Sequence, residues 1–417
     1  MAGLIPEAAV RVISGKWSAN LTKSGRADLP IEKMTVHSSK LSSQIAIAVS
    51  CLLISACATY RSSALDSADD MRAYLADMPK AELHLHLEGT LSPETIVAIT
   101  RRNDIEYFRT VDEIEESLIN RPPGLMGFLE HHFRMQNVMQ GRQDFYDATY
   151  NLVQKLSENN IVYVDLFFDP QAHTSRGIAF DEMFGGIDEA RRDAEAEFGV
   201  TVNLIMCINR ERSVASAFEM LDQANGVREK IIGLGMDSGP EYGNPPTKFK
   251  EVYARARNEG YFLTGHHDVD VRDSVNHIWQ SLEIIGMDRI DHGLNSAEDS
   301  RLVGELVRRG TCLTGSPIKR TSDPAPQDVD LITTLDKAGV CVSLNSDDPA
   351  EFESGYLTNM LVLFQAASEY TKADMTRLAL NGFESIWLPE AEKKAYVAEL
   401  RMYAVSNGVD WSSVERN

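Results

Sequence analysis

The sequence predicts an α/β protein, a TIM-type (β/α)8 barrel with a helical insertion after its first strand. Two observations support this prediction: short apolar runs alternate with longer amphipathic stretches, and the runs have the length and composition of buried parallel strands. In chain order, the predicted strands are Glu82–Leu87, Val162–Phe168, Val202–Ile208, Ile231–Met236, Tyr261–Gly265, Arg289–His292, Thr311–Gly315 and Cys341–Asn345.

The stretches between these runs have the apolar spacing of surface helices. Asp144–Asn159 shows it most clearly, and four others follow the same pattern: Phe180–Phe198, Thr247–Glu259, Ser274–Ile285 and Glu298–Arg309. Residues 104–140 separate the first two strands, so we expect them to form a helical insertion over the mouth of the barrel. Within this insertion, residues 121–127 (Arg-Pro-Pro-Gly-Leu-Met-Gly) predict a loop.

Composition limits the partners that this chain can have. The 417 residues are 43% hydrophobic, and the formal net charge is -21. Because no basic stripe is visible, a nucleic-acid partner is not expected. A small neutral or cationic molecule fits this charge better. No glycine-rich phosphate loop precedes a helix, so the sequence predicts no nucleotide cofactor.

The amino-terminal segment has the features of an export signal. Residues 34–40 are polar with one positive charge, and the apolar run 45–54 is too short to span the ~30 Å hydrocarbon core of a membrane but suits a signal peptide. Residues 53–57 (Leu-Ile-Ser-Ala-Cys) resemble the bacterial lipobox, which implies lipidation of Cys57. A chance apolar stretch in an amino-terminal extension is the alternative.

This resemblance implies an outline for the whole chain. Residues 1–57 are a leader and lipoprotein signal peptide, with translation starting at Met1 or Met34, and residues 58–75 are a polar tether. Residues 76–417 form the barrel. The non-acidic Ala58 after the cysteine implies anchoring on the periplasmic side of the outer membrane of a Gram-negative bacterium, so that lipidated Cys57 is the chain's membrane contact.

The five cysteines suggest no zinc knuckle and no disulfide scaffold, because no Cys-x-x-Cys pair occurs. Beyond the amino-terminal segment three remain: Cys207, Cys312 and Cys341. All three lie in apolar strand-like runs. We therefore expect them to be buried thiols, even in an oxidising periplasm.

Polar residues fall where the predicted strands end. His84 and His86 close the first strand, and two residues apart on one strand they point the same way. The others come after or at the end of later strands: His266, His292, Asp347 and Asp348. The carboxyl ends of barrel strands share one rim, so these side chains should converge at the mouth.

Three neutral imidazoles and a carboxylate are a suitable catalytic zinc shell, with one position open to water. Zinc would lower the pKa of that water towards ~7. His292, beside the metal, is placed to accept or orient the water proton. Asp348 follows Asp347 directly, so its side chain should point elsewhere and reach a substrate.

The region from about Pro79 to Pro389 resembles the adenosine/adenine deaminase branch of the amidohydrolase superfamily. The motifs that carry the resemblance are His-Leu-His-Leu-Glu-Gly at 84–89, Asp-His-Gly at 291–293 and Ser-Asp-Asp-Pro at 346–349. Residues 167–177 (Phe-Phe-Asp-Pro-Gln-Ala-His-Thr-Ser-Arg-Gly) are close to the adenine-deaminase-like subgroup.

The resemblance implies roles for individual residues and a reaction. One zinc ion would be held by the metal set, defined as His84, His86, His266 and Asp347. His292 would handle the attacking water, and Asp348 would hydrogen-bond a purine ring nitrogen. The family adds hydroxide to purine C6 and expels ammonia.

Further positions bear on the substrate. Where adenosine deaminases typically carry a ribose-binding aspartate, this chain has Glu88, as in the adenine deaminase subgroup, followed by Gly89. Residues 236–249, which contain Glu241, are also similar to a segment of that subgroup with one residue inserted. We therefore expect Glu88, Gly89 and Glu241 to bind substrate, and a free base to be preferred. A solvated loop carboxylate is the alternative for Glu88, and the insertion leaves the match of Glu241 open.

One segment departs from the family pattern. After the fifth strand the family reads His-Ala-Gly-Glu, and that glutamate protonates the purine ring. This chain reads His-His-Asp-Val-Asp at 266–270, with Val269 at the glutamate position. Asp268 or Asp270 is the expected catalytic replacement, and His267 is an alternative donor or ligand. Lys319 and Arg320 also alter the mouth after the seventh strand.

The sequence thus predicts a zinc-dependent hydrolytic deaminase of an adenine-like or N6-substituted aminopurine, which releases ammonia or an amine. Two alternatives remain. One is a zinc hydrolase of another amino-heterocycle or amide-like bond. The other is a non-catalytic periplasmic protein that binds purines or zinc.

Overall fold

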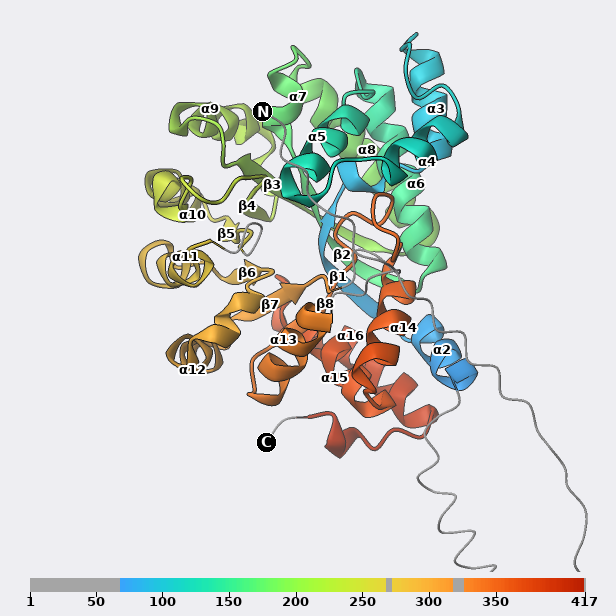
Figure 1. Cartoon of the computed structure of the whole chain (residues 1–417), viewed down its shortest axis with the longest axis vertical. Coiled ribbons are helices and arrows are strands. Elements are labelled where there is room, and N and C mark those ends of the chain that lie inside the picture. Colours follow the sequence, from blue (N-terminus) through green and yellow to red (C-terminus); the bar gives the residue numbers. More distant parts are fainter. Residues whose placement is uncertain (1–67, 268–271, 318–325, 416–417) are drawn as a thin grey trace, which may run out of the picture. The chain divides into compact units, whose positions relative to one another are not determined.

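The computed structural model describes residues 68–267, 272–317 and 326–415 (Figure 1). In these ranges the strands are β1 (Lys80–His86), β2 (Ile161–Phe168), β3 (Thr201–Asn209), β4 (Gly233–Asp237), β5 (Phe262–Leu263), β6 (Arg289–Asp291), β7 (Cys312–Gly315) and β8 (Val342–Leu344). They coincide with the eight predicted strands to within a few residues, which confirms the predicted order.

The strands pair in parallel and in sequence order, β1 to β5 in one sheet and β6 to β8 in another. Parallel bridges from Leu85 to Asp347 and from His266 to Asp291 link the two sheets at both edges. This is the arrangement of a (β/α)8 barrel, and the predicted fold class is confirmed. The strands are almost entirely buried because the helices lie around them (Figure 1).

The outer layer consists of the helices that follow the strands. Between β2 and β6 they are α7 (Pro170–Thr174), α8 (Phe180–Phe198), α9 (Val214–Ala224), η3 (Asn225–Lys230), η4 (Pro246–Phe249), α10 (Lys250–Asn258), α11 (Ser274–Gln280) and the π-turn η5 (Ser281–Ile285). After β6 come η6 (Leu294–Glu298), α12 (Ser300–Arg309), α13 (Pro326–Lys337), α14 (Leu357–Ser368), α15 (Lys372–Glu384), α16 (Glu390–Ser406) and η7 (Trp411–Ser413). Two of the predicted helices, 247–259 and 274–285, are each divided into a regular helix and a short 3₁₀ or π segment.

The predicted insertion after the first strand is helical. It contains α4 (Val111–Ile119) and α5 (Gly124–Gln136), preceded by η2 (Glu88–Thr90) and α3 (Pro93–Arg102) and followed by α6 (Arg142–Glu158). Thr110 begins α4 by accepting a hydrogen bond from the Glu113 amide at 3.2 Å, a standard amino-terminal cap. The loop predicted at 121–127 is shorter than expected, because α5 already begins at Gly124.

The part of the expected tether that the structure describes is helical. Helix α2 (Ala68–Asp77) buries Met71, Tyr74 and Leu75. Residues 58–75 are polar overall, which favoured the prediction of a tether. Met71, Tyr74 and Leu75 nevertheless have the i, i+3, i+4 spacing of one helix face. Residues 1–67, with the signal peptide and Cys57, lie outside the described residues. None of the helices that the structure describes is long and apolar enough to cross a membrane.

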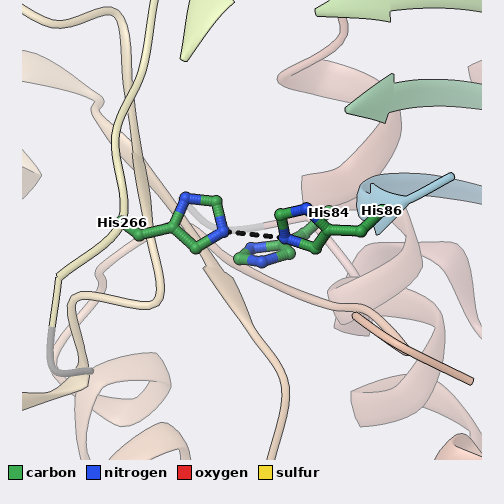
Figure 2. Close-up of side chains that lie close together, drawn as sticks. All are labelled: His84, His86 and His266. Atoms are coloured by element: carbon green, nitrogen blue, oxygen red, sulfur yellow. Dashed lines mark hydrogen bonds between the residues drawn. The ribbon is translucent and has the colours of Figure 1, made fainter. Parts of the chain in front are cut away.

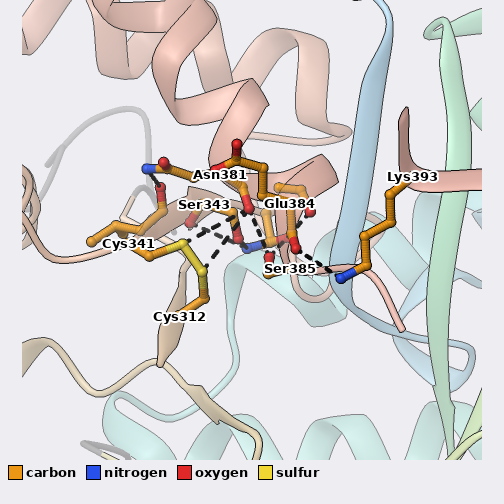
Figure 3. The surroundings of a disulfide bond; sticks show 10 residues. Cys312, Cys341, Ser343, Asn381, Glu384, Ser385 and Lys393 are labelled. Carbon is orange, nitrogen blue, oxygen red and sulfur yellow. Dashed lines mark hydrogen bonds between the residues drawn. A yellow bond between two sulfur atoms is a disulfide. The ribbon is translucent and has the colours of Figure 1, made fainter. Parts of the chain in front are cut away.

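The expectation of three buried thiols is confirmed for one cysteine and wrong for two. Cys207 is free and buried, whereas Cys312 and Cys341 form a disulfide with their Cα atoms 4.5 Å apart (Figure 3). The physical reason is the register of β7 and β8. Leu313 pairs with Val342, so the residues one step earlier on each chain lie side by side.

Candidate active site

The metal set comes together at the carboxyl-terminal ends of the strands, and Figure 2 shows its three histidines. His86 Nε2 lies 3.0 Å from His266 Nε2 and 3.5 Å from Asp347 Oδ1, and His84 Nε2 lies 3.3 Å from the same oxygen. All four residues are less than a tenth exposed. The predicted convergence of these residues is therefore found in the structure.

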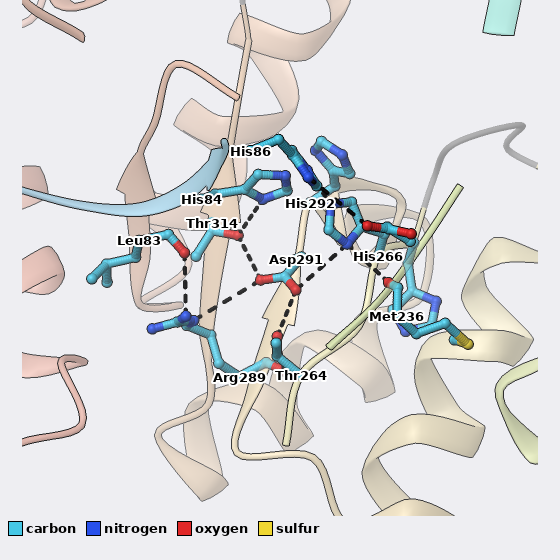
Figure 4. Close-up of polar contacts among 12 residues, drawn as sticks. Leu83, His84, His86, Met236, Thr264, His266, Arg289, Asp291, His292 and Thr314 are labelled. Carbon is cyan, nitrogen blue, oxygen red and sulfur yellow. Dashed lines mark hydrogen bonds and ion pairs between the residues drawn. The ribbon is translucent and has the colours of Figure 1, made fainter. Parts of the chain in front are cut away.

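The hydrogen bonds behind two of these imidazoles fix which nitrogen faces the centre (Figure 4). Thr314 donates to Asp291 Oδ1 at 3.1 Å, so its hydroxyl oxygen accepts from His84 Nδ1 at 2.9 Å. His266 Nδ1 donates to the Met236 carbonyl at 2.9 Å. In each ring the proton is on Nδ1, and Nε2 presents a lone pair.

This arrangement tests whether a metal ion fits. His84 Nε2 is buried and makes no hydrogen bond in the described part of the chain, although a carboxylate oxygen of Asp347 is its near neighbour. A lone pair and a carboxylate facing each other are stabilised only by a positive charge between them. His84, His86 and His266 each offer an atom within 4.8 Å of the others, as do His84, His292 and Asp347. The residues fit a divalent cation.

The charge states agree with this reading. Burial, together with the neighbouring His84 and His86, lowers the pKa of His266 well below its ordinary value. Burial alone would raise the pKa of Asp347, but the surrounding histidines, first His84, hold it well below the usual range. Neutral imidazoles and an ionised carboxylate are the forms that bind metal ions.

His292 and Asp347 both have left-handed backbone conformations, with φ of 57° and 65°. Such conformations cost on the order of 1–3 kcal/mol in a residue other than glycine and are concentrated at functional sites. Backbone hydrogen bonds hold them, from the His292 amide to the Thr314 carbonyl and from the Asp347 amide to the His84 carbonyl, each 3.1 Å. As a result His292 Nε2 lies 3.9 Å from Asp347 Oδ2.

A cavity of about 350 Å³ opens beside the metal set. Apolar side chains of the insertion and of the loop after β8 form one wall: Pro122, Pro123, Leu125, Phe128, Leu129 and Phe352. Polar groups form the rest, including His132, Asp169, Asp237, His292 and Asp348. The cavity therefore joins an apolar surface to a group of carboxylates and imidazoles, as expected of a small-molecule site.

Asp348 and Gly89 are in contact at this cavity. A Cβ atom at position 89 would collide with the Asp348 carboxyl group, so only glycine permits this approach. Asp348 is 4% exposed, and its Oδ1 has no hydrogen-bond partner in the described part of the chain. Burial, followed by the Asp347 carboxylate, raises the pKa of Asp348. Asp348 is thus a polar group directed at the site and available to a ligand.

The other two predicted substrate-binding residues are buried and are not among the described residues that line the cavity. Glu88 accepts hydrogen bonds from His173 Nε2 at 2.9 Å and from the Asp169 amide at 3.1 Å. Glu241 is bonded by His267 Nδ1 at 3.0 Å and His277 Nδ1 at 2.8 Å. These contacts anchor the loops that carry neighbouring site residues.

The expected replacements for the family's proton donor, Asp268 and Asp270, lie outside the described residues, as do Lys319 and Arg320. His267 is described, and it is turned towards Glu241 and Ser281 Oγ, which lies 3.0 Å from its Nε2. It is buried and is not one of the cavity-lining residues found in the described ranges.

The structure also adds residues to which the sequence reasoning gave no role. Asp169 and Asp237 follow or end β2 and β4, where the same strand-end rule would have found them, and Asp237 Oδ2 lies 3.9 Å from His86 Nδ1. His132 comes from the middle of α5, and Glu351 from the loop after β8. No strand-end rule points to either of them.

A (β/α)8 barrel that gathers three imidazoles, a carboxylate and a further histidine at its mouth defines a metal-dependent hydrolase of the amidohydrolase type. Comparison with known proteins agrees. The chain belongs to the adenosine deaminase family, whose model matches residues 79–403.

Several relatives of this chain carry names that specify an activity. An adenine deaminase from Chlorobium luteolum is 40% identical over 335 residues, which are 79% of this chain and 96% of the relative. The crystal structure of adenine deaminase from Arthrobacter aurescens, 32% identical, superposes with a TM-score of 0.72 over 79% of this chain and 99% of that one. An amidohydrolase from Burkholderia ambifaria, solved with bound zinc, is 23% identical, with a TM-score of 0.71 and coverage of 81% and 95%, and shows a shared fold. The family and these relatives identify the chain as a hydrolytic deaminase.

Proposed function

We propose that this protein is a zinc-dependent deaminase that removes the 6-amino or N6-substituted amino group of an adenine-like purine. The observation that carries the proposal is the buried metal set, with His292 and Asp348 beside it, at the wall of one cavity. The relatives that are 36–40% identical and are named adenine deaminases support the choice of purine.

The donor set suits zinc. Three imidazole nitrogens and one carboxylate oxygen are its usual ligands in catalytic sites. His84, His86, His266 and Asp347 would hold one ion, and the orphaned Nε2 of His84 would gain its missing partner. Zinc bound there would supply a Lewis acid that makes water acidic enough to react at neutral pH.

The residues of this chain then have separate tasks. His292, with Nε2 directed towards Asp347, accepts the proton of the attacking water and holds it near the leaving amine. Asp348 hydrogen-bonds a purine ring nitrogen and so fixes C6 beside the metal set. Asp268 or Asp270 donates the proton to the ring. The apolar wall of α5 excludes bulk water and accommodates an N6-alkyl group.

A free base fits the site better than a nucleoside. Glu88 Oε1 already accepts from His173 and from the Asp169 amide, and Glu88 is not among the described residues that line the cavity. Its role in substrate binding is to position Asp169, which does line the cavity. Gly89 contributes by letting Asp348 approach closely.

The test uses residues 58–417 purified with zinc and measures ammonia or amine release from adenine, N6-methyladenine and adenosine. Release from a free base but not from adenosine is the expected result. If the folded, zinc-loaded protein releases nothing from any of them, deamination of these purines is excluded. Other amino-heterocycles would then be the next candidates.

We also propose that the chain is exported and anchored through lipidated Cys57. The Cys312–Cys341 disulfide supports this proposal, because disulfides persist in oxidising compartments such as the periplasm. Fractionation of a Gram-negative host tests it. The full chain should sediment with the outer membrane and its Cys57→Ala variant should not, whereas equal partitioning of the two would exclude lipid anchoring.

A further inference from the structure

A second cluster of charged side chains lies next to the metal set. His132 Nδ1 donates to Glu351 Oε1 at 2.6 Å, and His131 Nδ1 donates to the other oxygen, Oε2, at 3.3 Å. All three residues are less than a tenth exposed. We call these three residues the His131–His132–Glu351 cluster. It joins helix α5 of the insertion to the loop after β8.

Within this cluster the two histidines face different surroundings. His131 Nε2 lies 2.9 Å from Ser117 Oγ on α4, and its Nδ1 is bonded to Glu351, so both of its ring nitrogens are engaged. His132 lines the cavity, and its Nδ1 is only 3.8 Å from Asp348 Oδ1. Within the described part of the chain, no partner of His132 Nε2 is found. His132 therefore has one nitrogen fixed by Glu351 and one left for a ligand.

The charge of the cluster is also set by these contacts. Burial opposes a charge on His132, but the Glu351 carboxylate raises the pKa of His132 to about 10. Burial would likewise raise the pKa of Glu351, yet His132 and His131 lower it to about 2. A protonated imidazole carries a proton on both nitrogens, so His132 can donate from Nε2 into the cavity while Nδ1 stays on Glu351.

We propose that His132 is a specificity-determining residue of the deaminase site. Its Nε2–H donates a hydrogen bond to an acceptor on the imidazole-ring edge of the purine, N7 or an oxygen on C8. The inference rests on the proposed function, because C6 must lie at the metal set. A purine so placed has N1 on one side of C6 and the imidazole ring on the other. We assign the imidazole-ring edge to the side that meets Asp348, and His132 meets the same side because these two residues are neighbours.

The site would then select purines that carry a hydrogen-bond acceptor on the imidazole-ring edge. When the ligand has no acceptor at this edge, the Nε2–H of His132 loses the hydrogen bond to the ligand while Nδ1 stays on Glu351. Removal of a hydrogen bond to a charged group costs roughly 10–100-fold in affinity or rate. The enzyme should therefore discriminate against 7-deazaadenine, in which carbon replaces N7, relative to adenine and 8-oxoadenine.

Two substitutions at one position separate the two nitrogens. The His132→Asn amide occupies the place of Nδ1, so it keeps the bond to Glu351 and removes the donor at Nε2. The His132→Gln amide reaches the place of Nε2 instead. His131→Asn is the matched control. His131 bonds the same Glu351 carboxylate but is not among the described residues that line the cavity. Glu351→Gln weakens the charge of His132 without removing it from the cavity.

The experiment measures kcat/KM of the zinc-loaded full chain for adenine, 8-oxoadenine and 7-deazaadenine. Calorimetry measures the binding of the corresponding products, hypoxanthine, its 8-oxo form and 7-deazahypoxanthine. His132→Asn should lower kcat/KM and affinity about 10–100-fold for at least one acceptor-bearing purine and leave the 7-deaza compounds nearly unchanged. His132→Gln should retain part of the wild-type preference for acceptor-bearing purines over the 7-deaza compounds, and His131→Asn should retain most of it.

Equal losses for all three purines in His132→Asn would overturn the inference, and the proposed function would stand. If the wild-type protein deaminates no purine but its product binding shows the expected pattern, the proposed function fails and the role of His132 stands. Should His132→Asn not fold, the Glu351→Gln variant decides. If its ratio of kcat/KM for adenine to kcat/KM for 7-deazaadenine equals that of wild type, the inference is overturned.

Discussion

Buried polar groups at the mouth of the barrel differ from buried Lys80 at its amino end in whether they find partners within the protein. At the carboxyl end, His84 Nε2 and Asp348 Oδ1 are buried without a hydrogen bond in the described residues, and His292 and Asp347 have left-handed backbones. At the amino end, buried Lys80 donates to three carbonyl oxygens at 2.7–3.0 Å, those of Leu75, Ala76 and Met78. The mouth leaves these polar groups for a ligand, whereas the Lys80 ammonium is satisfied by backbone carbonyls of the protein.

The disulfide belongs to the amino end as well. Cys312 begins β7 and Cys341 directly precedes β8, so the bond joins the amino ends of neighbouring strands, opposite the ends that carry the metal set. Substitutions at the mouth should therefore lower activity with little loss of stability. Substitutions at the opposite end should do the reverse. Four changes test this division.

The largest effect is expected for His84→Ala. It removes an imidazole that we propose as a metal ligand and whose Nε2 makes no hydrogen bond in the described structure, so bound zinc and activity should be lost together. We expect kcat/KM to fall by at least about 10³-fold, since a metal supplies several kcal/mol of transition-state stabilisation. Metal analysis and ammonia release measure the two losses, and calorimetric unfolding of the metal-free proteins should show little difference from wild type. Full activity with one zinc bound would exclude His84 as a ligand.

His292→Asn should affect the reaction and leave the metal in place. His292 Nε2 lies 3.9 Å from Asp347 Oδ2, beside the metal set, and we propose that it handles the proton of the attacking water. Loss of a general base typically costs about 10²–10⁴-fold in rate. The measurement is kcat at saturating adenine together with the zinc content. A variant that loses its zinc would show instead that His292 is part of the metal site.

A smaller effect is expected for Thr314→Val, because Thr314 contacts His84 and not the metal position itself. The substitution keeps the shape but removes the oxygen that accepts from His84 Nδ1 and donates to Asp291 (Figure 4). Loss of such an outer partner commonly lowers metal affinity about 10–100-fold. Competition with a chelator measures the zinc dissociation constant. Thr333→Val on α13, whose hydroxyl bonds only its own helix, is the control and should behave as wild type.

The difference between the ends also explains which residues the sequence could predict. The convergence of His84, His86, His266 and Asp347 was predictable because strand periodicity and barrel geometry place strand-terminal side chains at one rim, however far apart they are in the chain. The same rule would have found Asp169 and Asp237, which occupy equivalent positions on β2 and β4. Glu241 follows β4, but its loop turns the carboxylate inward to two histidines.

Other features depend on contacts that no local pattern contains. His132 reaches the cavity only because α5 lies over the mouth, and the orientation of an insertion is set by tertiary packing. The disulfide follows from the strand register, since Cys312 and Cys341 each stand one residue before a paired position. An adjacent-strand assignment combined with that register would have predicted it, whereas apolar surroundings alone suggested free thiols.

The smallest effect on activity, and the clearest on stability, is expected for the double substitution Cys312→Ala and Cys341→Ala. A disulfide that closes a loop of this length stabilises a protein by about 2–4 kcal/mol, so denaturant unfolding should shift by that amount. The kcat/KM of the folded variant should stay at the wild-type value, because the bond lies at the opposite end from the metal set. A reductant should reproduce the shift in wild-type protein and in Cys207→Ala but not in the double variant. If reduction lowers activity of the folded protein instead, the two ends are coupled through β7 and β8, and the separation of chemistry from stability fails.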